Sequence, residues 1–125
     1  MKTSNTYNFA LLFLRVGFSG MMLTHGIPKL LKLASGDFSF VDPIGIGAPA
    51  SLVLAVLCEV VFPVLIIIGF KTRLASIPVL ITMAIAAFAH HANDAFGVKE
   101  KAILYLIGFI TIALLGAGRY SADRK

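Results

Sequence analysis

The sequence predicts an all-α polytopic membrane protein, an antiparallel bundle of four transmembrane helices, from its composition and its pattern of apolar runs. Of the 125 residues, 58% are hydrophobic and 14% are charged, whereas a soluble domain is about half apolar and about a quarter charged. Four apolar runs are bounded by Gly, Pro and charged residues. Because a bilayer-spanning helix needs about 20 mostly apolar residues, four spans leave room for only a single membrane domain over residues 1–125.

The four predicted helices cover about residues 7–31, 50–70, 74–90 and 102–115. Arg15 interrupts the first run and no small-residue cleavage site follows, so we read this segment as a retained helix rather than a secretory signal. Pro28 cannot donate a backbone hydrogen bond, and we expect the first helix to kink or end near Gly26. The connection at residues 71–73 allows only an antiparallel hairpin, which makes the second and third helices neighbours.

The net charge of +5 raises the question of nucleic-acid binding. The basic residues stand singly or in pairs at the ends of apolar runs, which favours membrane topology over a nucleic-acid partner. The side carrying both termini has six Lys and Arg residues and the opposite side has four, so the positive-inside rule predicts that both termini are cytoplasmic. The six are Lys2, Lys71, Arg73, Arg119, Arg124 and Lys125, and the four are Lys29, Lys32, Lys99 and Lys101.

Five ionisable residues fall inside or at the ends of the predicted spans: Arg15, His25, Lys29, Glu59 and His90. Such residues normally face a partner or a water-filled cavity, because the hydrocarbon core disfavours charge. Arg15 and Lys29 are two heptads apart, so with His25 they form one stripe on the first helix. We expect this stripe to face the interior of the bundle.

Depth along the helices predicts a buried ion pair between Arg15 and Glu59. A rise of about 1.5 Å per residue places Arg15 about 12 Å from the inner edge of a core about 30 Å thick, and Glu59 about 14 Å from the outer edge. Each charge would otherwise be unpaired in a medium of low dielectric constant. The pair either fixes the register of two helices or takes part in function.

The same count places His25 and His90 in one layer near the outer edge. With Lys29, and with His91 as a further candidate, they are predicted to line a small polar pocket that opens outwards. Because the first helix offers His25 no second ligand and adjacent histidines point about 100° apart, we predict no metal site. Hydrogen bonding, or handling of a proton or substrate, is the favoured role.

No phosphate-binding loop, serine elbow or haem-attachment motif occurs, so neither catalytic residues nor a cofactor can be assigned from motifs. A quinone needs apolar walls with one or two polar groups, and the predicted pocket could provide them. Cys58 is the only cysteine, which excludes an internal disulfide or dithiol pair. We interpret it as a small apolar residue in a helix.

A series of short motifs runs in order along nearly the whole chain: Leu14-Arg15 before a Gly, His25-Gly26-x-x-Lys29-Leu30, Glu59 in its apolar helix, Gly69-Phe70-x-Thr72-Arg73, Met83, and Gly118-Arg119-Tyr120-Ser121-x-Asp123. This set resembles the DoxX family of small four-helix membrane proteins. The family takes its name from a subunit of a membrane thiosulfate:quinone oxidoreductase. The resemblance implies a redox-associated membrane protein with a redox protein partner, without implying thiosulfate oxidation.

Three functions remain open at this stage. The first is a subunit or accessory of a quinone-linked or thiol-related redox system, such as an oxidoreductase subunit, in the lipid bilayer of the inner (plasma) membrane. The second is a non-catalytic scaffold or assembly protein, and the third is a small-solute or proton carrier acting as a homo-oligomer.

The tail carries a short polar motif made of Arg119, Tyr120 and Asp123. Tyr120 suits an anchor at the membrane interface, and Arg119 suits the inner side of the membrane. Together with Asp123 they form either an anchoring or a docking motif.

Overall fold

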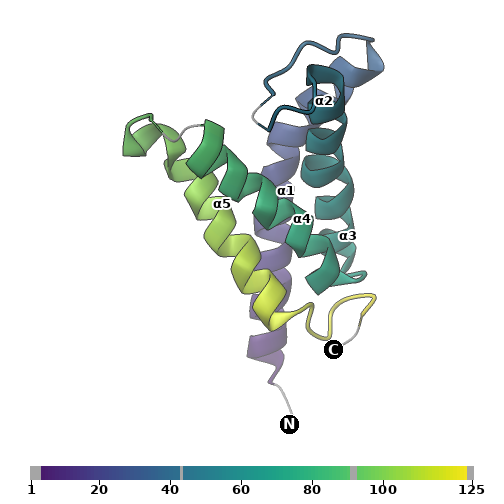
Figure 1. The fold of residues 1–125 in the computed structure, drawn as a ribbon. Helices are drawn as coiled ribbons and strands as arrows, with labels where there is room; N and C mark the ends of the chain where they lie inside the picture. Colours follow the sequence, from purple (N-terminus) through teal and green to yellow (C-terminus); the bar gives the residue numbers. More distant parts are fainter. Residues whose placement is uncertain (1–3, 43, 91–92, 124–125) are drawn as a thin grey trace.

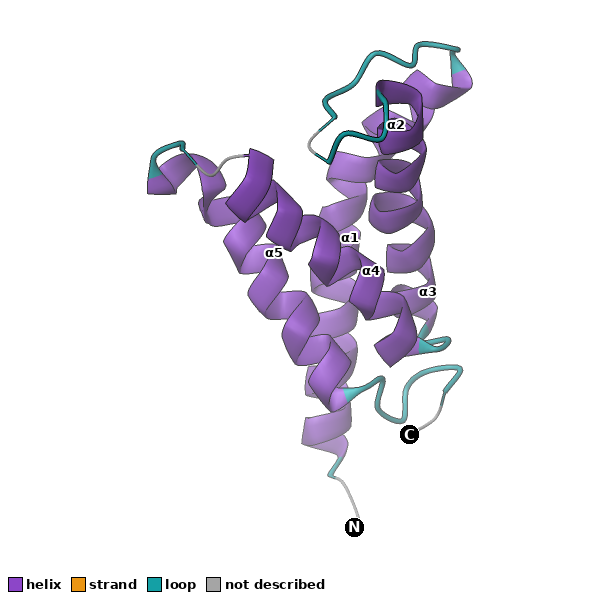
Figure 2. Ribbon diagram, viewed as in Figure 1, coloured by secondary structure: helices purple, strands orange, loops and turns teal. Residues whose placement is uncertain are grey.

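The computed structural model describes residues 4–42, 44–90 and 93–123, with only the backbone at residues 90 and 98. This part of the chain is helical and without strands (Figures 1 and 2). Its elements are α1 (Asn5–Ala34), α2 (Ala48–Val56), η1 (Leu57–Val61), α3 (Phe62–Ile68), α4 (Thr72–Ile85), η2 (Ala86–His90) and α5 (Phe96–Leu115). The elements α2, η1 and α3 follow one another as one rod, as do α4 and η2, so the predicted all-α four-helix fold is confirmed.

Three of these rods are long and apolar enough to cross a membrane, over residues 5–34, 48–68 and 72–89. The fourth, α5, begins at Phe96, six residues before the predicted start at 102. Lys99, Glu100 and Lys101 belong to its first turns, because Lys and Glu are good helix formers as well as common loop residues. The exposed apolar side chains on the outside of the bundle, such as Phe13 and Leu114, suit contact with lipid.

The first helix begins with a cap, in which the Ser4 hydroxyl accepts a hydrogen bond from the Tyr7 N–H at 3.1 Å. It continues through Pro28 to Ala34, so of the two outcomes expected near Gly26, a kink or an end, the end is wrong. Pro28 removes a single backbone hydrogen bond, which a helix of 30 residues supported by its neighbours tolerates.

The second rod contains a π-helical segment, η1, with Glu59 at its centre. Pro63 has no N–H to donate to the carbonyl of Glu59, four residues earlier, so regular α-helical bonding cannot continue there. The Phe62 N–H instead bonds to the carbonyl of Leu57, five residues back. Single-turn π-helical bulges are rare and occur often at functional sites, which directs attention to Glu59.

The second and third rods form the predicted antiparallel hairpin. Gly69 ends α3 with φ of 80°, and Lys71 precedes α4 with φ of 50°, so both occupy the left-handed region. α1 packs on α2, η1 and α3, while α4 packs mainly on α5. The start of α1 and the tail after α5 lie at the same end of the bundle (Figure 1). The core that joins the rods consists of Met22, Ile66, Ala75, Val79, Met83, Tyr105, Phe109 and Ile112.

Candidate functional site

The centre of the candidate site is an ion pair between Lys29 of α1 and Glu59 of η1. The Lys29 Nζ atom donates to Glu59 Oε1 at 2.6 Å and to Oε2 at 2.7 Å. The Glu59 side chain is 5% exposed and that of Lys29 is 30% exposed. The Lys29 ammonium also lies 5.6 Å from the centroid of the Phe40 ring, a cation–π contact with the loop after α1. A buried carboxylate therefore has one partially accessible cationic partner.

The predicted ion pair between Arg15 and Glu59 is wrong. Glu59 pairs with Lys29, and the guanidinium of Arg15 reaches the carbonyls of Ile66 and Ile67 at 2.8 and 2.9 Å. Those carbonyls stand seven and eight residues beyond Glu59, or about 11 Å along the helix. The sequence estimate assumed a register between α1 and the second rod that packing does not adopt.

Close packing between α1 and η1 sets the observed register. A Cβ atom added to Gly26 would overlap the carbonyl oxygen of Glu59. Glycine therefore lets α1 approach the same carbonyl that Pro63 leaves without its α-helical donor. Lys29 lies one turn beyond Gly26, which brings its side chain to the Glu59 carboxylate.

Arg15 is fully buried and connects three segments at the opposite end of the bundle. Besides the two α3 carbonyls, its Nε donates to the Ala117 carbonyl at 2.9 Å and its Nη2 to the Tyr120 carbonyl at 2.6 Å. Four carbonyl oxygens thus surround one guanidinium, whose five N–H donors match them. Its role in this geometry is to hold the tail against α1 and α3.

Asp123 secures the same tail to the start of α4. Its carboxylate accepts hydrogen bonds from the N–H of Lys71 at 2.8 Å and of Thr72 at 2.9 Å. The Asp123 N–H in turn donates to the Gly69 carbonyl at 2.8 Å. The tail and turn motifs found in the sequence are therefore parts of one structural junction. Arg119 and Tyr120 are exposed beside it, and Tyr120 contributes its carbonyl to Arg15.

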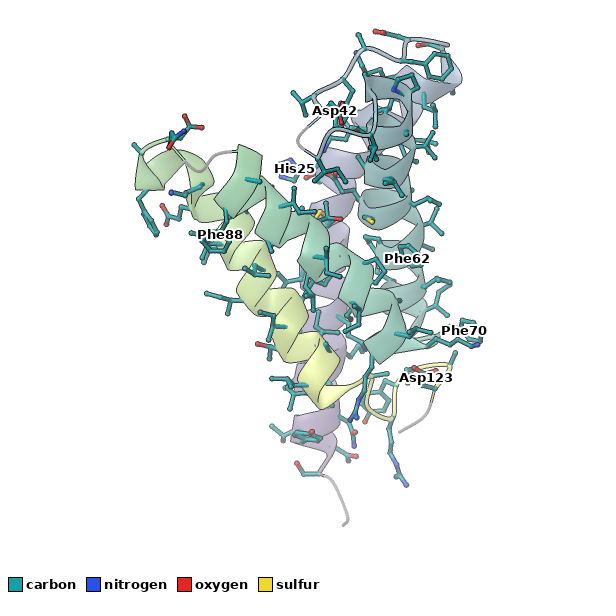
Figure 3. All side chains as sticks on the ribbon, viewed as in Figure 1. His25, Asp42, Phe62, Phe70, Phe88 and Asp123 are labelled. Atoms are coloured by element: carbon teal, nitrogen blue, oxygen red, sulfur yellow. The ribbon has the colours of Figure 1, made fainter. Side chains whose placement is uncertain are left out.

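A polar cavity of about 240 Å³ lies on one side of the ion pair. His25 and Lys29 line it together with Lys101 and Tyr105 of α5, and Glu59 forms part of its wall. The rings of His25 and Tyr105 meet edge to face, with centroids 5.7 Å apart. Figure 3 shows His25 towards the end of the bundle opposite Asp123. The structure thus brings His25 and Lys29 to the same cavity.

A larger, mainly apolar cavity of about 640 Å³ lies on the other side of the pair, between α2–η1 and α4. Lys29, Glu59, Met83 and Ala86 line both cavities, so the ion pair stands where they adjoin. The remaining walls come from three segments and are mostly aliphatic: Val41, Ile44 and Ile46 of the loop, Leu54, Ala55 and Cys58 of the second rod, and Ile77, Ile81 and Ile85 of α4.

The loop wall of the apolar cavity is held by Asp42, labelled in Figure 3. Its carboxylate accepts hydrogen bonds from the N–H groups of Ile46 and Gly47, each at 2.9 Å, and from the Ser51 hydroxyl at 3.0 Å. The Gly47 N–H is the main cause of a lowered pKa of the Asp42 carboxyl. These bonds fix the loop to the first turn of α2 and place Ile44 and Ile46 against the cavity.

The predicted contribution of the His90 side chain lies outside the described residues, as does His91. Within the described part of the chain, no group of three or more His, Cys, Asp and Glu side chains is arranged to hold a metal ion. What the geometry offers is a cationic and aromatic pocket joined to an apolar one. Such a pair of cavities suits an amphipathic ligand with hydrogen-bond acceptors at one end.

Sequence reasoning missed Tyr105 and Lys101 as lining residues. A usable pattern was present, because the two are four residues apart and so share one face of a helix. Tyr105 is also a polar aromatic inside an apolar run, which suggests a hydrogen-bonding role at a buried surface. Reading Lys101 as part of a loop concealed this relationship.

The chain matches known proteins over most of its length. The family model described as DoxX matches residues 10–92, in agreement with the resemblance seen in the motifs. An inner membrane protein YphA of Escherichia coli strain K12 is 29% identical over 125 residues, covering 92% of this chain and 89% of that protein. An uncharacterized protein of Haemophilus influenzae is 30% identical over 128 residues, covering 94% of this chain and 90% of that protein. No solved structure matches the chain.

Proposed function

Because the chain belongs to the DoxX family of membrane proteins, we propose that it is an accessory subunit of an inner-membrane redox system that binds a membrane-dissolved quinone. The observation that supports this most is the position of the Lys29–Glu59 ion pair between a polar and an apolar cavity. The Escherichia coli relative is an inner membrane protein by name, which supports the inner membrane as the location of this chain. The excess of Lys and Arg on the side of the termini supports cytoplasmic ends.

In this proposal the apolar cavity takes the isoprenoid tail. Its walls are aliphatic side chains from the loop, the second rod and α4, including Ile44, Leu54 and Ile81. The second rod and the α4 rod are both long and apolar enough to cross the membrane, so a lipid-soluble ligand can reach the cavity from the bilayer without passing through water. Burying an apolar chain there is favourable by about 25 cal/mol for each Å² removed from water.

The polar cavity takes the quinone ring. Quinone carbonyl oxygens accept hydrogen bonds, and Tyr105, His25 and Lys101 supply donors around a space of about 240 Å³. His25, whose imidazole can carry a proton, lines the same cavity. Reduction of the quinone to a quinol takes up two electrons and two protons, and a partner redox protein supplies the electrons. The single cysteine means that dithiol–disulfide chemistry would also involve a thiol of the partner.

Titration of the purified full-length protein in nanodiscs tests this proposal. A quinone with a decyl tail is expected to bind saturably, and the same ring without the tail more weakly, as measured by calorimetry. Tyr105→Phe removes one hydrogen bond and should weaken both ligands about fivefold. Ile81→Trp fills the apolar cavity and should weaken only the tailed quinone.

Leu114→Trp is the matched control, because Leu114 is 73% exposed on α5 and lines neither cavity beside the ion pair. An equal effect of Ile81→Trp and Leu114→Trp on the affinity for the tailed quinone would show that the tail does not occupy the cavity. An absence of saturation with either quinone would overturn the proposal.

A scaffold function is the second candidate, and the junction around Arg15 favours it. That junction ties α1, α3, α4 and the tail together through hydrogen bonds between the side chains of Arg15 and Asp123 and backbone atoms, an arrangement that confers rigidity. A scaffold predicts that Ile81→Trp and Tyr105→Phe leave partner copurification unchanged and that no quinone binds.

A further inference from the structure

A third cavity of about 460 Å³ lies at the end of the bundle that carries the tail, away from the ion pair. It is bounded by the start of α1, the α3–α4 turn and the residues after α5, and it shares no lining residue with the two cavities beside Glu59. Its polar lining includes Lys71, Thr72, Arg73 and Asp123. The quinone proposal makes no use of this cavity.

Arg73 provides the main cationic group of this cavity. Within the described residues its guanidinium makes one hydrogen bond, from Nη2 to the Leu115 carbonyl at a long 3.4 Å. Gly116 lets the side chain lie close, since a Cβ there would be 2.9 Å from the Arg73 Nε. A guanidinium has five N–H donors in a planar fork that fits phosphate, so most of them are available to a ligand.

Thr72 provides an independent indication of a ligand. The residue is 1% exposed and lines the cavity, and its hydroxyl has no hydrogen-bond partner within the described part of the chain. Buried polar groups normally have a partner, and one without a protein partner points to a bound water or ligand. A phosphate oxygen next to Arg73 would accept this hydrogen bond.

The charge of the cavity favours an anion. Lys71 and Arg73 contribute two positive charges and Asp123 one negative charge, which leaves one net positive charge. The Asp123 carboxylate is directed to the N–H groups of Lys71 and Thr72, which disperse its charge. The Lys71 ammonium lies 5.7 Å from the Phe70 ring centroid, and the flexible lysine side chain can turn towards an anion in the cavity.

The other walls are apolar and lie where helices end at the membrane surface. Leu11, Leu74 and Leu115 line the cavity, and Leu74 is 68% exposed on the outside of α4. Tyr7 adds an aromatic ring suited to the depth of lipid headgroups. We infer that this cavity binds the phosphodiester headgroup of an anionic phospholipid, with the headgroup on Arg73 and Thr72 and the acyl chains against Leu74.

Native mass spectrometry of the intact protein, delipidated in detergent and titrated with defined lipids, tests this inference. Phosphatidylglycerol is expected to remain bound at energies that release phosphatidylcholine. Arg73→Gln should weaken phosphatidylglycerol binding about tenfold or more, because it removes charge-assisted hydrogen bonds. Arg73→Lys keeps the charge but lacks the planar fork of N–H donors, so its affinity for phosphatidylglycerol should lie between those of Arg73→Gln and the wild type.

Arg119→Gln is the matched control, because Arg119 is an exposed cation at the same end that does not line the cavity. A loss equal to that of Arg73→Gln would show a general surface effect and overturn the site. Equal retention of both lipids would also overturn it, and full displacement of phosphatidylglycerol by inorganic phosphate would assign the cavity to free phosphate instead. If Arg73→Gln unfolds, as judged by its thermal midpoint, Thr72→Val provides the test instead. Weaker phosphatidylglycerol binding by Thr72→Val supports the site, and unchanged binding refutes it.

Discussion

Lys29 and Glu59 join α1 to the π-helical segment η1 through hydrogen bonds from one ammonium to both carboxylate oxygens. The two residues differ in access to water, since the Glu59 side chain is 5% exposed and the Lys29 side chain 30%. A charge left alone in a low-dielectric interior is costly, whereas a charge that can reach water is less so. The two halves of this pair should therefore respond differently to mutation.

Lys29→Met should destabilise the protein more than Glu59→Gln does. The first leaves a buried carboxylate without its cation, at a cost of about 3–5 kcal/mol. The second leaves a lysine that can turn towards water, so we expect a smaller loss. The double variant should recover most of the stability lost in Lys29→Met, as measured by reversible unfolding in mixed detergent micelles followed by circular dichroism.

Lys32→Met serves as the control for this series. Lys32 is also a cation of α1 in an ion pair, 2.9 Å from Asp37, but both side chains are substantially exposed. Exposed pairs contribute about 0–1 kcal/mol, so this variant should stay close to the wild type. A Lys29→Met loss no larger than that of Lys32→Met would contradict the buried role of the pair.

Gly26→Ala should be strongly destabilising, because the new methyl group would overlap the backbone carbonyl of Glu59. A backbone atom cannot move aside as a flexible side chain can, so α1 must separate from η1, and the cost should exceed about 2 kcal/mol. Gly17→Ala and Gly20→Ala are matched controls on the same helix, since nothing lies within 4 Å of a Cβ at either position. They should be neutral or stabilising by up to about 1 kcal/mol, and equal effects at all three positions would refute the close contact.

The helices could be predicted from the sequence because apolar runs and charged boundaries report directly on membrane spans. The hairpin between the second and third helices was also predictable, since a connection of three residues admits only a hairpin, although it lies at residues 69–71 rather than the predicted 71–73. The start of α5 was not, because Lys99 and Glu100 suit a loop and a helix equally well. Sequence hydropathy does not distinguish those two environments.

The partner of Glu59 could not be predicted, because it depends on the register between α1 and the second rod. The long loop after Ala34 allows that rod to slide by several residues without any change in hydropathy. Contact between Gly26 and the carbonyl oxygen of Glu59 decides the register. Pro63 leaves this oxygen without its α-helical donor, a local backbone feature that hydropathy does not report. The pocket residues His25 and Lys29 were found because membrane depth and helix face alone select them.

The carboxyl group of Asp37, in the loop after α1, should titrate with a pKa of about 2. The main cause is the hydrogen bond from the Ser39 hydroxyl, followed by that from Lys32. Because the folded-state pKa lies below the ordinary value of 3.8, the stabilising contribution is complete above that value and is lost as the pH falls through about 2. Carbon-13 NMR of the labelled carboxyl should give this value, and Ser39→Ala should raise it.

Ser35→Ala is the control for that titration. The Ser35 hydroxyl donates to the Lys32 carbonyl at 2.8 Å and is not among the groups that lower the pKa of Asp37, so that pKa should not change. An Asp37 pKa near 3.8 in the wild type would show that the loop does not hold these hydrogen bonds in solution.

Arg15→Met should release the tail and destabilise the bundle. It leaves the carbonyls of Ile66, Ile67, Ala117 and Tyr120 without the guanidinium, and hydrogen bonds to a charged group contribute about 1.5–3 kcal/mol each. Arg15→Lys should recover part of the lost stability, because an ammonium keeps the charge but lacks the planar fork of donors that reaches all four carbonyls.

Asp123→Asn should lower the free energy of unfolding by about 1 kcal/mol, since an amide has one oxygen for the two N–H groups of Lys71 and Thr72.

Limited trypsin digestion measures tail release directly, because cleavage after Arg119 requires the tail to leave its place. We expect cleavage to accelerate in the order wild type, Asp123→Asn, Arg15→Lys and Arg15→Met, in parallel with the unfolding free energy. Ser121→Ala is the control, since the Ser121 hydroxyl donates to the carbonyl of the nearby Gly118 and a small residue still fits against Gly69. Cleavage of the wild type as fast as that of Arg15→Met would mean that the guanidinium does not hold the tail, and the scaffold reading of this junction would then fail.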